Sequence, residues 1–425
     1  MTKEDIIGAA FKVWGRDLYR TTSLTEIARE LRVSKPALYR HFKDKDALLE
    51  TMDTAFFNDC AGFTKTGYKK AINAGNSREA LMIWIRTLAE YYVRNREAMV
   101  FSLFRVYNSR DRKIVIKEFH DRDIDFEHPA LREDPSSFYP FKMQFAIATL
   151  FFCVAQFHRR NGKFQDPHTE DQVKRVLFEI EERITKGLGL DARKVAVLNY
   201  QALELKAFGT VYEDTENNTL LRAVAEAVAE AGPWDASMEM VARRSGLSKS
   251  GLYAHFKNKN DMLARLFITE FSRILNFAKT QVETTEESEE QLYLAIISIV
   301  GYLHSRPEIL VIMDWIKTER LELGKEVSNR LNRIIRGIKL KAIQEYDIQK
   351  LVFVAKWILF MIVNTLAWWP QNGNPSDQAE KNSYPRTGDS GQDSIIWAKN
   401  AAEIPNESFR ILFRFIALGF EGLNK

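Results

Sequence analysis

Two short stretches of the sequence concentrate basic side chains, which could bind the phosphate groups of a nucleic acid. Residues 32–45 hold five basic residues and one acidic residue, a net charge of +4, and residues 243–259 hold five basic residues and no acidic one, +5. The whole chain of 425 residues carries 61 Lys and Arg against 57 Asp and Glu, which is only +4. Basic clusters on a nearly neutral protein are typical of phosphate binding.

Both basic stretches belong to a block that occurs twice. Residues 23–49 read SLTEIARELRVSKPALYRHFKDKDALL, and residues 237–263 read SMEMVARRSGLSKSGLYAHFKNKNDML, aligned without a gap at an offset of 214. Over residues 21–49, 12 of 29 positions are identical, where chance would give about two. A weaker match continues at an offset of 211, with residues 89–100 over 300–311. The chain therefore contains two copies of one unit.

Each copy of the block predicts two short helices joined by a tight turn. In the first copy a short helix begins after Ser23, and a turn at Arg32 leads to a helix from Lys35 to His41. Ser34 and Asp44 are placed to cap this helix and the one after it. The predicted core residues of the module are Ile6, Ala10, Val13, Trp14, Leu24, Ile27, Ala28, Leu31, Leu38 and Phe42. This is a helix-turn-helix arrangement, whose second helix can enter the DNA major groove.

The block resembles the DNA-binding domain of the TetR-type transcriptional regulators. The segments SKPALYRHFKDKDALL and SKSGLYAHFKNKNDML are similar to that family's pattern, and the rest of each copy matches it in helix order. Family members carry an N-terminal three-helix DNA-binding domain followed by an all-helical ligand-binding and dimerisation domain. The resemblance implies an all-α fold, made of two such units in tandem.

This organisation predicts five segments. Each copy contributes a helix-turn-helix domain and a helical regulatory domain, joined by a helical linker in which Asp191 caps one helix carrying the stripe Val195, Leu198, Ala202 and Leu205. The segments are 1–50, 51–190, the linker 191–214, 215–264 and 265–425. An insertion near 371–405, rich in Gly, Pro, Ser, Asn and Asp, is expected to be a surface loop, with a lid over a pocket as the alternative.

The resemblance also implies which residues contact DNA. Phosphate contacts fall to Ser34, Lys35, Tyr39, His41, Lys43 and Lys45, and to Ser248, Lys249, Tyr253, His255, Lys257 and Lys259. Base edges would face Pro36, Ala37 and Arg40 in the first module, and Ser250, Gly251 and Ala254 in the second. The alternative role of Tyr39, His41 and Phe42 is to hold the small domain together.

The two modules differ at the reading surface and at the turns. Arg40 can reach a guanine edge, whereas Ala254 offers only a methyl group, so unequal half-sites are expected. The glycines found as Gly232 and Gly246 in the second copy are Leu18 and Arg32 in the first. A non-glycine residue at positive φ costs about 1 kcal/mol, so either these turns are built differently or the first module is the less firmly organised one.

In the family, the last two helices of each regulatory domain pair with those of a partner. In this chain the pairs would be 141–160 with 171–188, and 351–369 with 408–423. Because both pairs lie on one polypeptide, they can associate internally at high effective concentration as a single-chain pseudo-dimer. The alternative is a homodimer of chains with four DNA-binding modules.

A small apolar or aromatic effector would bind inside the regulatory domains. Aromatic residues recur there at helical spacing, and the candidates are Trp84, Tyr91, Tyr92, Phe104 and Phe152 in one half and Tyr302, Trp315 and Trp357 in the other. The alternative is that these side chains form the hydrophobic core.

Other classes of site and location are disfavoured. The sequence has no GxSxG, GxxxxGK[ST], HExxH or Cys/His motif, so neither an enzyme nor a cofactor is expected. The acidic stretch from His120 to His128 fails as a calcium loop, because Phe126 and Arg132 stand where Gly and Glu belong. Two distant cysteines and a charged N-terminal stretch favour the cytoplasm. The apolar segment 351–369 is interpreted as a buried helix rather than a membrane span.

These observations favour a DNA-binding transcriptional regulator, most simply a ligand-released repressor, acting as a single-chain pseudo-dimer on an asymmetric pseudo-palindromic operator. The alternative is a ligand- or partner-binding protein of the same fold, with degenerate DNA binding in one or both modules.

Overall fold

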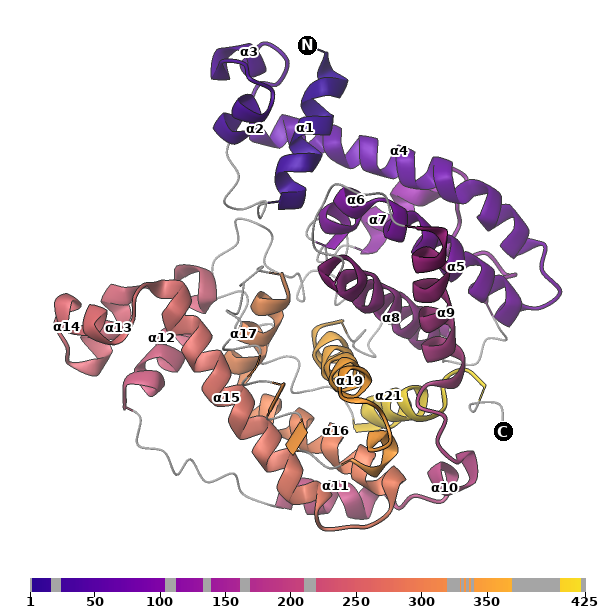
Figure 1. Ribbon diagram of the computed structural model, residues 1–425, viewed down its shortest axis with the longest axis vertical. Coiled ribbons are helices and arrows are strands. Elements are labelled where there is room, and N and C mark those ends of the chain that lie inside the picture. Colours follow the sequence, from indigo (N-terminus) through magenta and orange to yellow (C-terminus); the bar gives the residue numbers. More distant parts are fainter. Residues whose placement is uncertain are drawn as a thin grey trace. The chain divides into compact units, whose positions relative to one another are not determined.

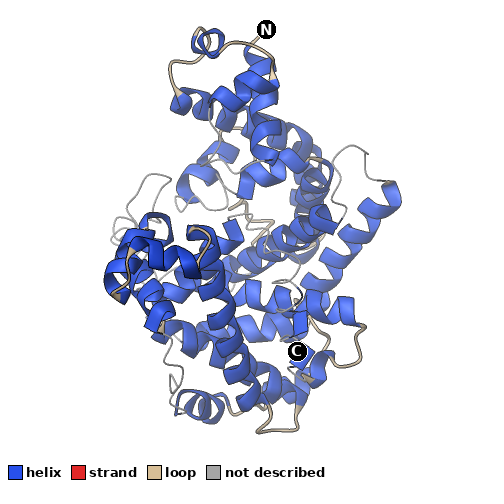
Figure 2. Cartoon of the chain, turned by 60° about the vertical axis from the view of Figure 1, so that its left-hand side comes forward, coloured by secondary structure: helices blue, strands red, loops and turns tan. Residues whose placement is uncertain are grey.

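The computed structural model is helical in every regular element that it describes (Figure 2). It describes residues 2–16, 24–103, 112–132, 139–160, 169–209, 219–318, 340–368 and 406–421, with a few isolated positions between 329 and 337. The chain forms two compact units, residues 1–182 and 183–425. The predicted insertion near 371–405 lies outside the described residues.

The first unit places a helix-turn-helix domain at the N-terminal end of a long helix, α4 (Figure 1). Its helices are α1 (Lys3–Arg16), α2 (Leu24–Glu30), α3 (Lys35–Tyr39), α4 (Lys45–Ile72), α5 (Ser77–Arg94), α6 (Arg96–Phe101), α7 (Arg112–His120), α8 (Tyr139–Arg160) and most of α9 (Glu170–Lys186). Helix α5 packs between α4 and α8, and α6 packs on α1. The regulatory core is therefore built on α5.

The second unit repeats this order behind two short connecting helices. Its helices are α10 (Ala192–Ala196), α11 (Tyr200–Gly209), α12 (Thr219–Asp235), α13 (Met238–Ser245), α14 (Lys249–His255), α15 (Lys259–Val282), α16 (Ser288–Ser305), α17 (Pro307–Thr318), the short 3₁₀ helix η2 (Lys341–Ile343), α19 (Ile348–Trp368) and α21 (Asn406–Leu418). Helix α16 packs on α15, and α17 packs on α12, as α5 packs on α4 and α6 on α1. The all-α tandem fold predicted from the sequence is confirmed.

The connection between the repeats is two helices and not the single one that was predicted. Asp191 does cap a helix, since its carboxylate accepts a hydrogen bond from the Arg193 amide at 2.9 Å, but that helix ends at Ala196. The Asn199 side chain then accepts from the Ala202 amide at 3.1 Å and starts α11. An N-capping residue inside the predicted stripe therefore breaks it, and Leu205 is left 75% exposed.

One described helix stretch, Ile348–Leu366 in α19, is long and apolar enough to cross a membrane by length and composition. More than half of this stretch is buried within the fold. Trp357 and Asn364 have exposed fractions of 0% and 1%, as expected for a core helix.

Candidate nucleic-acid interface

The first module forms a compact helix-turn-helix around a small apolar core. Ile27, Leu38 and Phe42 are buried, and so is the predicted face of α1, with Ile6 and Ala10 at 0% exposure. Helix α3 ends at Tyr39, two residues earlier than predicted, because the amide of His41 donates to the Leu38 carbonyl and tightens the last turn. Arg40 therefore lies in the turn that follows α3.

The turn before the recognition helix has the same geometry in both modules. Arg32 has φ 56°, and Gly246 at the equivalent place has φ 70°. The next amide donates back to the preceding helix in each case, Val33 to Ala28 at 2.9 Å and Leu247 to Ala242 at 3.0 Å. This is the left-handed helix cap that glycine adopts without strain. The first module therefore keeps the turn of the second, although Arg32 stands in place of glycine. Leu18, the other position where the first copy lacks a glycine, lies outside the described residues.

The two recognition helices are capped differently. In the second module, the Ser248 hydroxyl accepts a hydrogen bond from the Gly251 amide at 3.0 Å, and α14 continues to His255. Ser34 starts α3 with an extended backbone but makes no such side-chain bond. The next helix is capped in both modules, by Asp44 as predicted and by Asn258. The second recognition helix is therefore longer and better anchored at its start.

All predicted DNA-contact residues lie at or near the surface. Twelve of them are exposed, namely Ser34, Lys35, Pro36, Tyr39, Arg40, Lys43, Ser248, Lys249, Ser250, Tyr253, His255 and Lys257. The other five are half-buried: Ala37, His41, Lys45, Gly251 and Lys259. Ala254, the counterpart of Arg40, is also exposed. Tyr39 and Tyr253 are 46% and 47% exposed, which leaves both rings available to a ligand rather than committed to the core.

The lysine that opens each recognition helix has a different neighbour in the two modules. Lys249 forms an ion pair with Glu239 of α13, and this contact raises the pKa of the Lys249 ammonium. Lys35 instead lies 5.8 Å from the centre of the Tyr39 ring. The counterpart of Glu239 in the first module is Thr25. Sequence reasoning missed this ion pair. The signal that could have found it is Glu239, an acidic residue close to the basic stretch of the second copy.

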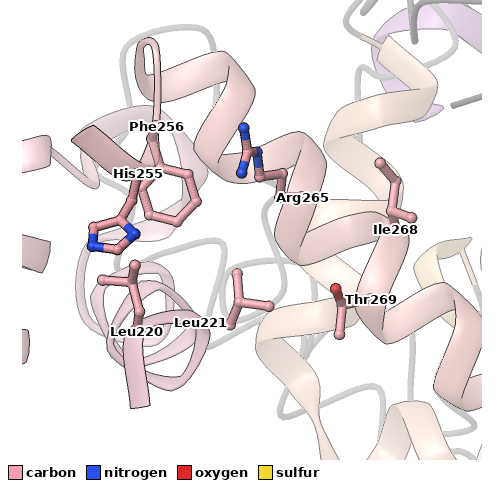
Figure 3. A pocket seen from close by; sticks show the side chains of 7 residues that line it. All are labelled: Leu220, Leu221, His255, Phe256, Arg265, Ile268 and Thr269. Atoms are coloured by element: carbon pink, nitrogen blue, oxygen red, sulfur yellow. The ribbon is translucent and has the colours of Figure 1, made fainter. Parts of the chain in front are cut away.

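A hollow of about 440 Å³ lies beside the second recognition helix (Figure 3). Leu220 and Leu221 of α12, His255 and Phe256 at the end of α14, and Arg265, Ile268 and Thr269 of α15 line it. The Arg265 guanidinium donates to Asp261 at 3.2 Å and lies 5.6 Å from the Phe256 ring centre. The hollow can hold an apolar group next to a cation. The aromatic residues predicted to bind an effector do not line it.

In the first regulatory domain, the predicted effector residues lie in the core. Trp84 is fully buried between Tyr68 and Phe126, with ring centres 5.5 and 5.6 Å away. The Tyr91 hydroxyl donates to Asp59 at 2.8 Å, and burial raises the pKa of Tyr91. Phe152 is 5% exposed and Tyr92 is buried as well, while Phe104 lies outside the described residues. Polar groups among these rings could orient a ligand or fix the packing.

The second regulatory domain holds a buried carboxylate at a comparable place. Glu270 of α15 is 1% exposed and accepts hydrogen bonds from Arg273, at 2.7 Å, and from the Tyr302 hydroxyl. The Arg306 guanidinium lies 3.7 Å away. Trp357 is fully buried, and nothing is described of the Trp315 side chain. Each domain thus pairs a tyrosine of its central helix with an acidic residue of the long helix beside it.

Helix α11 is bound to the second regulatory domain by a partly buried ion pair. Glu204 accepts two hydrogen bonds from Arg410 of α21, at 2.7 and 2.9 Å, and one from the Tyr293 hydroxyl of α16 at 2.5 Å. Burial alone would raise the pKa of Glu204, but these bonds outweigh it and lower that pKa. Phe208 lies over Gly301, where a Cβ atom would come within 2.7 Å of the ring. The connection is therefore an integral part of this domain.

Within the described part of the chain, no three His, Cys, Asp or Glu side chains are arranged to hold a metal ion. In the stretch from His120 to His128, Asp123 forms an ion pair with Lys65, and the Asp125 carbonyl accepts from Tyr68. These contacts tie the loop to α4.

The fold and this surface define a helix-turn-helix DNA-binding protein with helical regulatory domains. A family model described as bacterial regulatory proteins of the tetR family matches residues 6–52 and again residues 220–266. The chain therefore carries two DNA-binding domains of the tetR-family type.

Known relatives match parts of this chain. The fatty acid metabolism regulator protein of Bacillus subtilis (strain 168) is 23% identical over 165 residues, covering 37% of this chain and 85% of that protein. The crystal structure of the B. subtilis regulator FadR in complex with stearoyl-CoA matches at 20% identity, TM-score 0.28, over 44% of this chain and 96% of that one. The tetR-family regulator PfmR from Thermus thermophilus matches at 18% identity, TM-score 0.28, over 49% and 98%.

Proposed function

We propose that the protein is a ligand-released repressor whose two modules read the two unlike halves of one operator. The observation that carries this proposal is the pair of basic recognition surfaces on one polypeptide. Both surfaces expose a lysine and a tyrosine at equivalent places, but one presents Arg40 where the other presents Ala254. One chain then supplies both halves of the dimer that tetR-family regulators form, and the operator is an asymmetric pseudo-palindrome.

Release by a ligand would act through the spacing of the modules. Major-groove readers of adjacent half-sites need a separation of about 34–36 Å between recognition helices. The central helices α5 and α16 each pack on the long helix that carries a DNA-binding domain, α4 or α15. An effector that binds one state of these helices better than the other would therefore shift the modules away from that spacing.

The effector is proposed to be a small, largely apolar molecule held in the regulatory domains. The rings predicted to bind it, Trp84, Tyr91 and Phe152 in one domain and Tyr302 and Trp357 in the other, are buried beside acidic and hydroxyl groups. The name of the curated B. subtilis relative makes fatty-acid-derived compounds the first class to test. Cys60 and Cys153 are both buried and form no disulfide, which is compatible with action in the reducing cytoplasm.

A second candidate is a ligand-binding protein whose first module no longer binds DNA specifically. It is favoured by Arg32, which holds a left-handed conformation without glycine, and by the shorter, uncapped helix α3. In that case the second half-site alone would be recognised.

Charge reversal in each module tests the proposal. We expect Lys43→Glu with Lys45→Glu, and separately Lys257→Glu with Lys259→Glu, to weaken operator binding and to flatten its salt dependence. Each lost phosphate contact should reduce the slope of log affinity against log salt by about 0.9. Lys69→Glu with Lys70→Glu, two exposed lysines in the last turn of α4, is the matched control.

Two outcomes would contradict the repressor proposal in different ways. If neither module variant differed from the control, DNA binding would not use these surfaces. If only the variant of the second module weakened binding, the protein would be the second candidate, in which the first module no longer binds DNA specifically. Thermal unfolding of each variant verifies that the loss of binding is not a loss of fold, since Lys45 is half-buried.

A further inference from the structure

The basic surface of the second module is partly neutralised by acidic residues of the same module. Helices α13 and α14 pack against each other (Figure 1). Glu239, in the first turn of α13, forms an ion pair with Lys249, the residue that opens α14. Arg244 is paired in the same way with Glu230 of α12. Two of the five basic residues in the stretch 243–259 therefore already have an acidic partner in the protein alone.

The Glu239 carboxylate is held beside Lys249 by more than one interaction. Bonds to Lys249, to its own backbone amide and to Ser237, the residue that caps α13, lower the pKa of Glu239. An acidic side chain in the first turn of a helix is also favoured by the helix dipole. The side chains of Lys249 and Glu239 are 58% and 60% exposed, so the pair lies open to a ligand.

A carboxylate at this place competes with the phosphate group that Lys249 is expected to bind. Lys249 stands at the start of the recognition helix, and the exposed Tyr253 follows one turn later. A phosphate that contacts the Lys249 ammonium would lie next to the Glu239 carboxylate, and two negative charges repel each other. DNA must therefore exchange one negative partner of Lys249 for another, with little gain in charge pairing.

The first module lacks this competitor. The residue equivalent to Glu239 is Thr25, which is exposed and carries no charge. Lys35, the equivalent of Lys249, lies 5.8 Å from the centre of the Tyr39 ring. A phosphate can reach Lys35 without displacing an acid from this position. The longer and capped recognition helix favours the second module, whereas the charge of the surface favours the first.

We propose that Glu239 sets the order in which the two modules bind DNA, because its carboxylate takes the place of a phosphate on Lys249. The first module binds first through Lys35. The second module follows once the first holds it near the neighbouring half-site at a high effective concentration. This inference rests on the proposed function, because it names a residue that distinguishes the two modules during operator binding.

Neutralisation of Glu239 in full-length chains with one active module tests the inference. Lys43→Glu with Lys45→Glu leaves the second module to bind DNA, and Lys257→Glu with Lys259→Glu leaves the first. The probe is a fluorescent duplex of mixed sequence, long enough for two half-sites. Fluorescence anisotropy at several salt concentrations measures the affinity of each chain and its salt dependence.

The effect of Glu239→Gln should be confined to the chain in which the second module is active. There it should raise the affinity about fivefold at about 0.15 M salt and steepen the slope of log affinity against log salt by about 0.9, as one additional phosphate contact does. In the chain with an active first module, Glu239→Gln should change neither quantity. Thr25→Glu should lower the affinity of that chain by a similar factor.

Glu283→Gln is the matched control, because it removes the same charge from an exposed side chain at the far end of α15, paired with Lys279 at 3.6 Å. It should leave the affinity of both chains unchanged. Circular dichroism verifies that each variant keeps its helix content. The inference would be overturned if Glu239→Gln left binding by the second module unchanged, if it acted equally in both chains, or if Glu283→Gln had the same effect.

Failure of this inference and failure of the proposed function give different results. The duplex of mixed sequence reports phosphate contacts and requires no operator. A protein that shows the Glu239→Gln effect but selects no specific sequence would keep the inference and lose the repressor. A protein that binds an operator specifically, and equally well with Glu239 or Gln at this position, would do the reverse.

Discussion

Helices α5 and α16 occupy the same place in the two repeats. One equivalent face of these helices, however, contacts different partners in the two repeats. On α5 this face carries Arg86, which forms an ion pair with Glu181, and Glu90, paired with Arg94 at 2.9 Å. At an offset of 211, the same positions of α16 are Ile297, which is buried, and Gly301. Here the face is covered by α11.

The difference shows that two repeats with the same order of helices can cover the same helix face in different ways. The connecting segment lies along the second regulatory domain, where α11 covers an apolar face of α16. Tyr293, Ile297 and Gly301 stand where the first repeat has Met82, Arg86 and Glu90, and they form a surface that fits α11, where Glu204 anchors the helix. The two repeats share one fold and differ in which helix faces are covered by other helices.

The largest effect should come from returning the first repeat's residue to this face. Gly301→Glu places a carboxylate under the Phe208 ring, and we expect it to lower the free energy of unfolding by about 3 kcal/mol through overpacking and burial of charge. The reciprocal Glu90→Gly should cost only about 1 kcal/mol, the difference in helix propensity. Urea denaturation followed by circular dichroism measures both. Equal losses would mean that α11 is not packed on α16 in solution.

The next largest effect is expected on operator binding, at the residues of each module that face the bases. Arg40→Ala should weaken binding to the half-site read by the first module by about 2 kcal/mol, the value of a bidentate contact with guanine. It should leave discrimination at the other half-site intact. Ala254→Arg should give the second module a new preference for guanine. Fluorescence anisotropy with operators altered in one half at a time measures this. If Arg40→Ala weakened binding to all sequences equally, Arg40 would contact phosphate instead.

A smaller and pH-dependent effect is expected at the α11 anchor. Glu204→Gln should lower the free energy of unfolding at pH 7 by about 1.5 kcal/mol, because a hydrogen-bonded charge is lost. The folded state lowers the pKa of Glu204 below its ordinary value of 4.5, so its stabilising contribution is complete above that value and disappears as the pH falls through the folded pKa. The difference in stability between the two proteins should therefore be complete at pH 7 and shrink as the pH falls below 4.5, which denaturation curves over this range measure.

Glu181→Gln is the control for Glu204→Gln, because it breaks the exposed pair with Arg86 in the first repeat. It should cost less than about 0.5 kcal/mol at every pH, as surface ion pairs do. A pH-independent loss in Glu204→Gln would instead indicate a packing effect.

The smallest effect should come from exchanging the turn residues of the two DNA-binding modules. Arg32→Gly should stabilise the chain by up to about 1 kcal/mol, and Gly246→Arg should destabilise it by a similar amount, because both turns have positive φ. Chemical denaturation of the two variants measures the change. If both substitutions changed the free energy of unfolding in the same direction, the two turns would not be energetically equivalent.

Much of this architecture could be predicted from the sequence because it depends on local pattern and on repetition. The 214-residue offset located both modules, and helical spacing identified buried residues such as Ile6, Ile27 and Leu38. Comparison with Gly246 identified the turn at Arg32, and of the two alternatives left open there the structure shows the one with positive φ. These features are encoded within a few turns of helix.

The features that sequence reasoning missed join distant positions or depend on an exact helix end. Glu204 and Arg410 are 206 residues apart, and neither belongs to a motif. The hydrogen bond from the Leu188 amide to the Ile416 carbonyl needs the ends of two helices to be known, and the predicted helix reached residue 423 where α21 ends at Leu418. The Asn199 cap was hidden within an apolar stripe of helical spacing. Such contacts follow from packing, not from local propensity.

The most direct test of the central claim is selection of bound sequences from a random duplex DNA library, with the mass of the selected complex measured alongside. The account predicts one near-palindrome with two unlike halves about one helical turn apart, bound by a single chain of 49.2 kDa. A longer site bound by two chains, or a site with two identical halves, would contradict it.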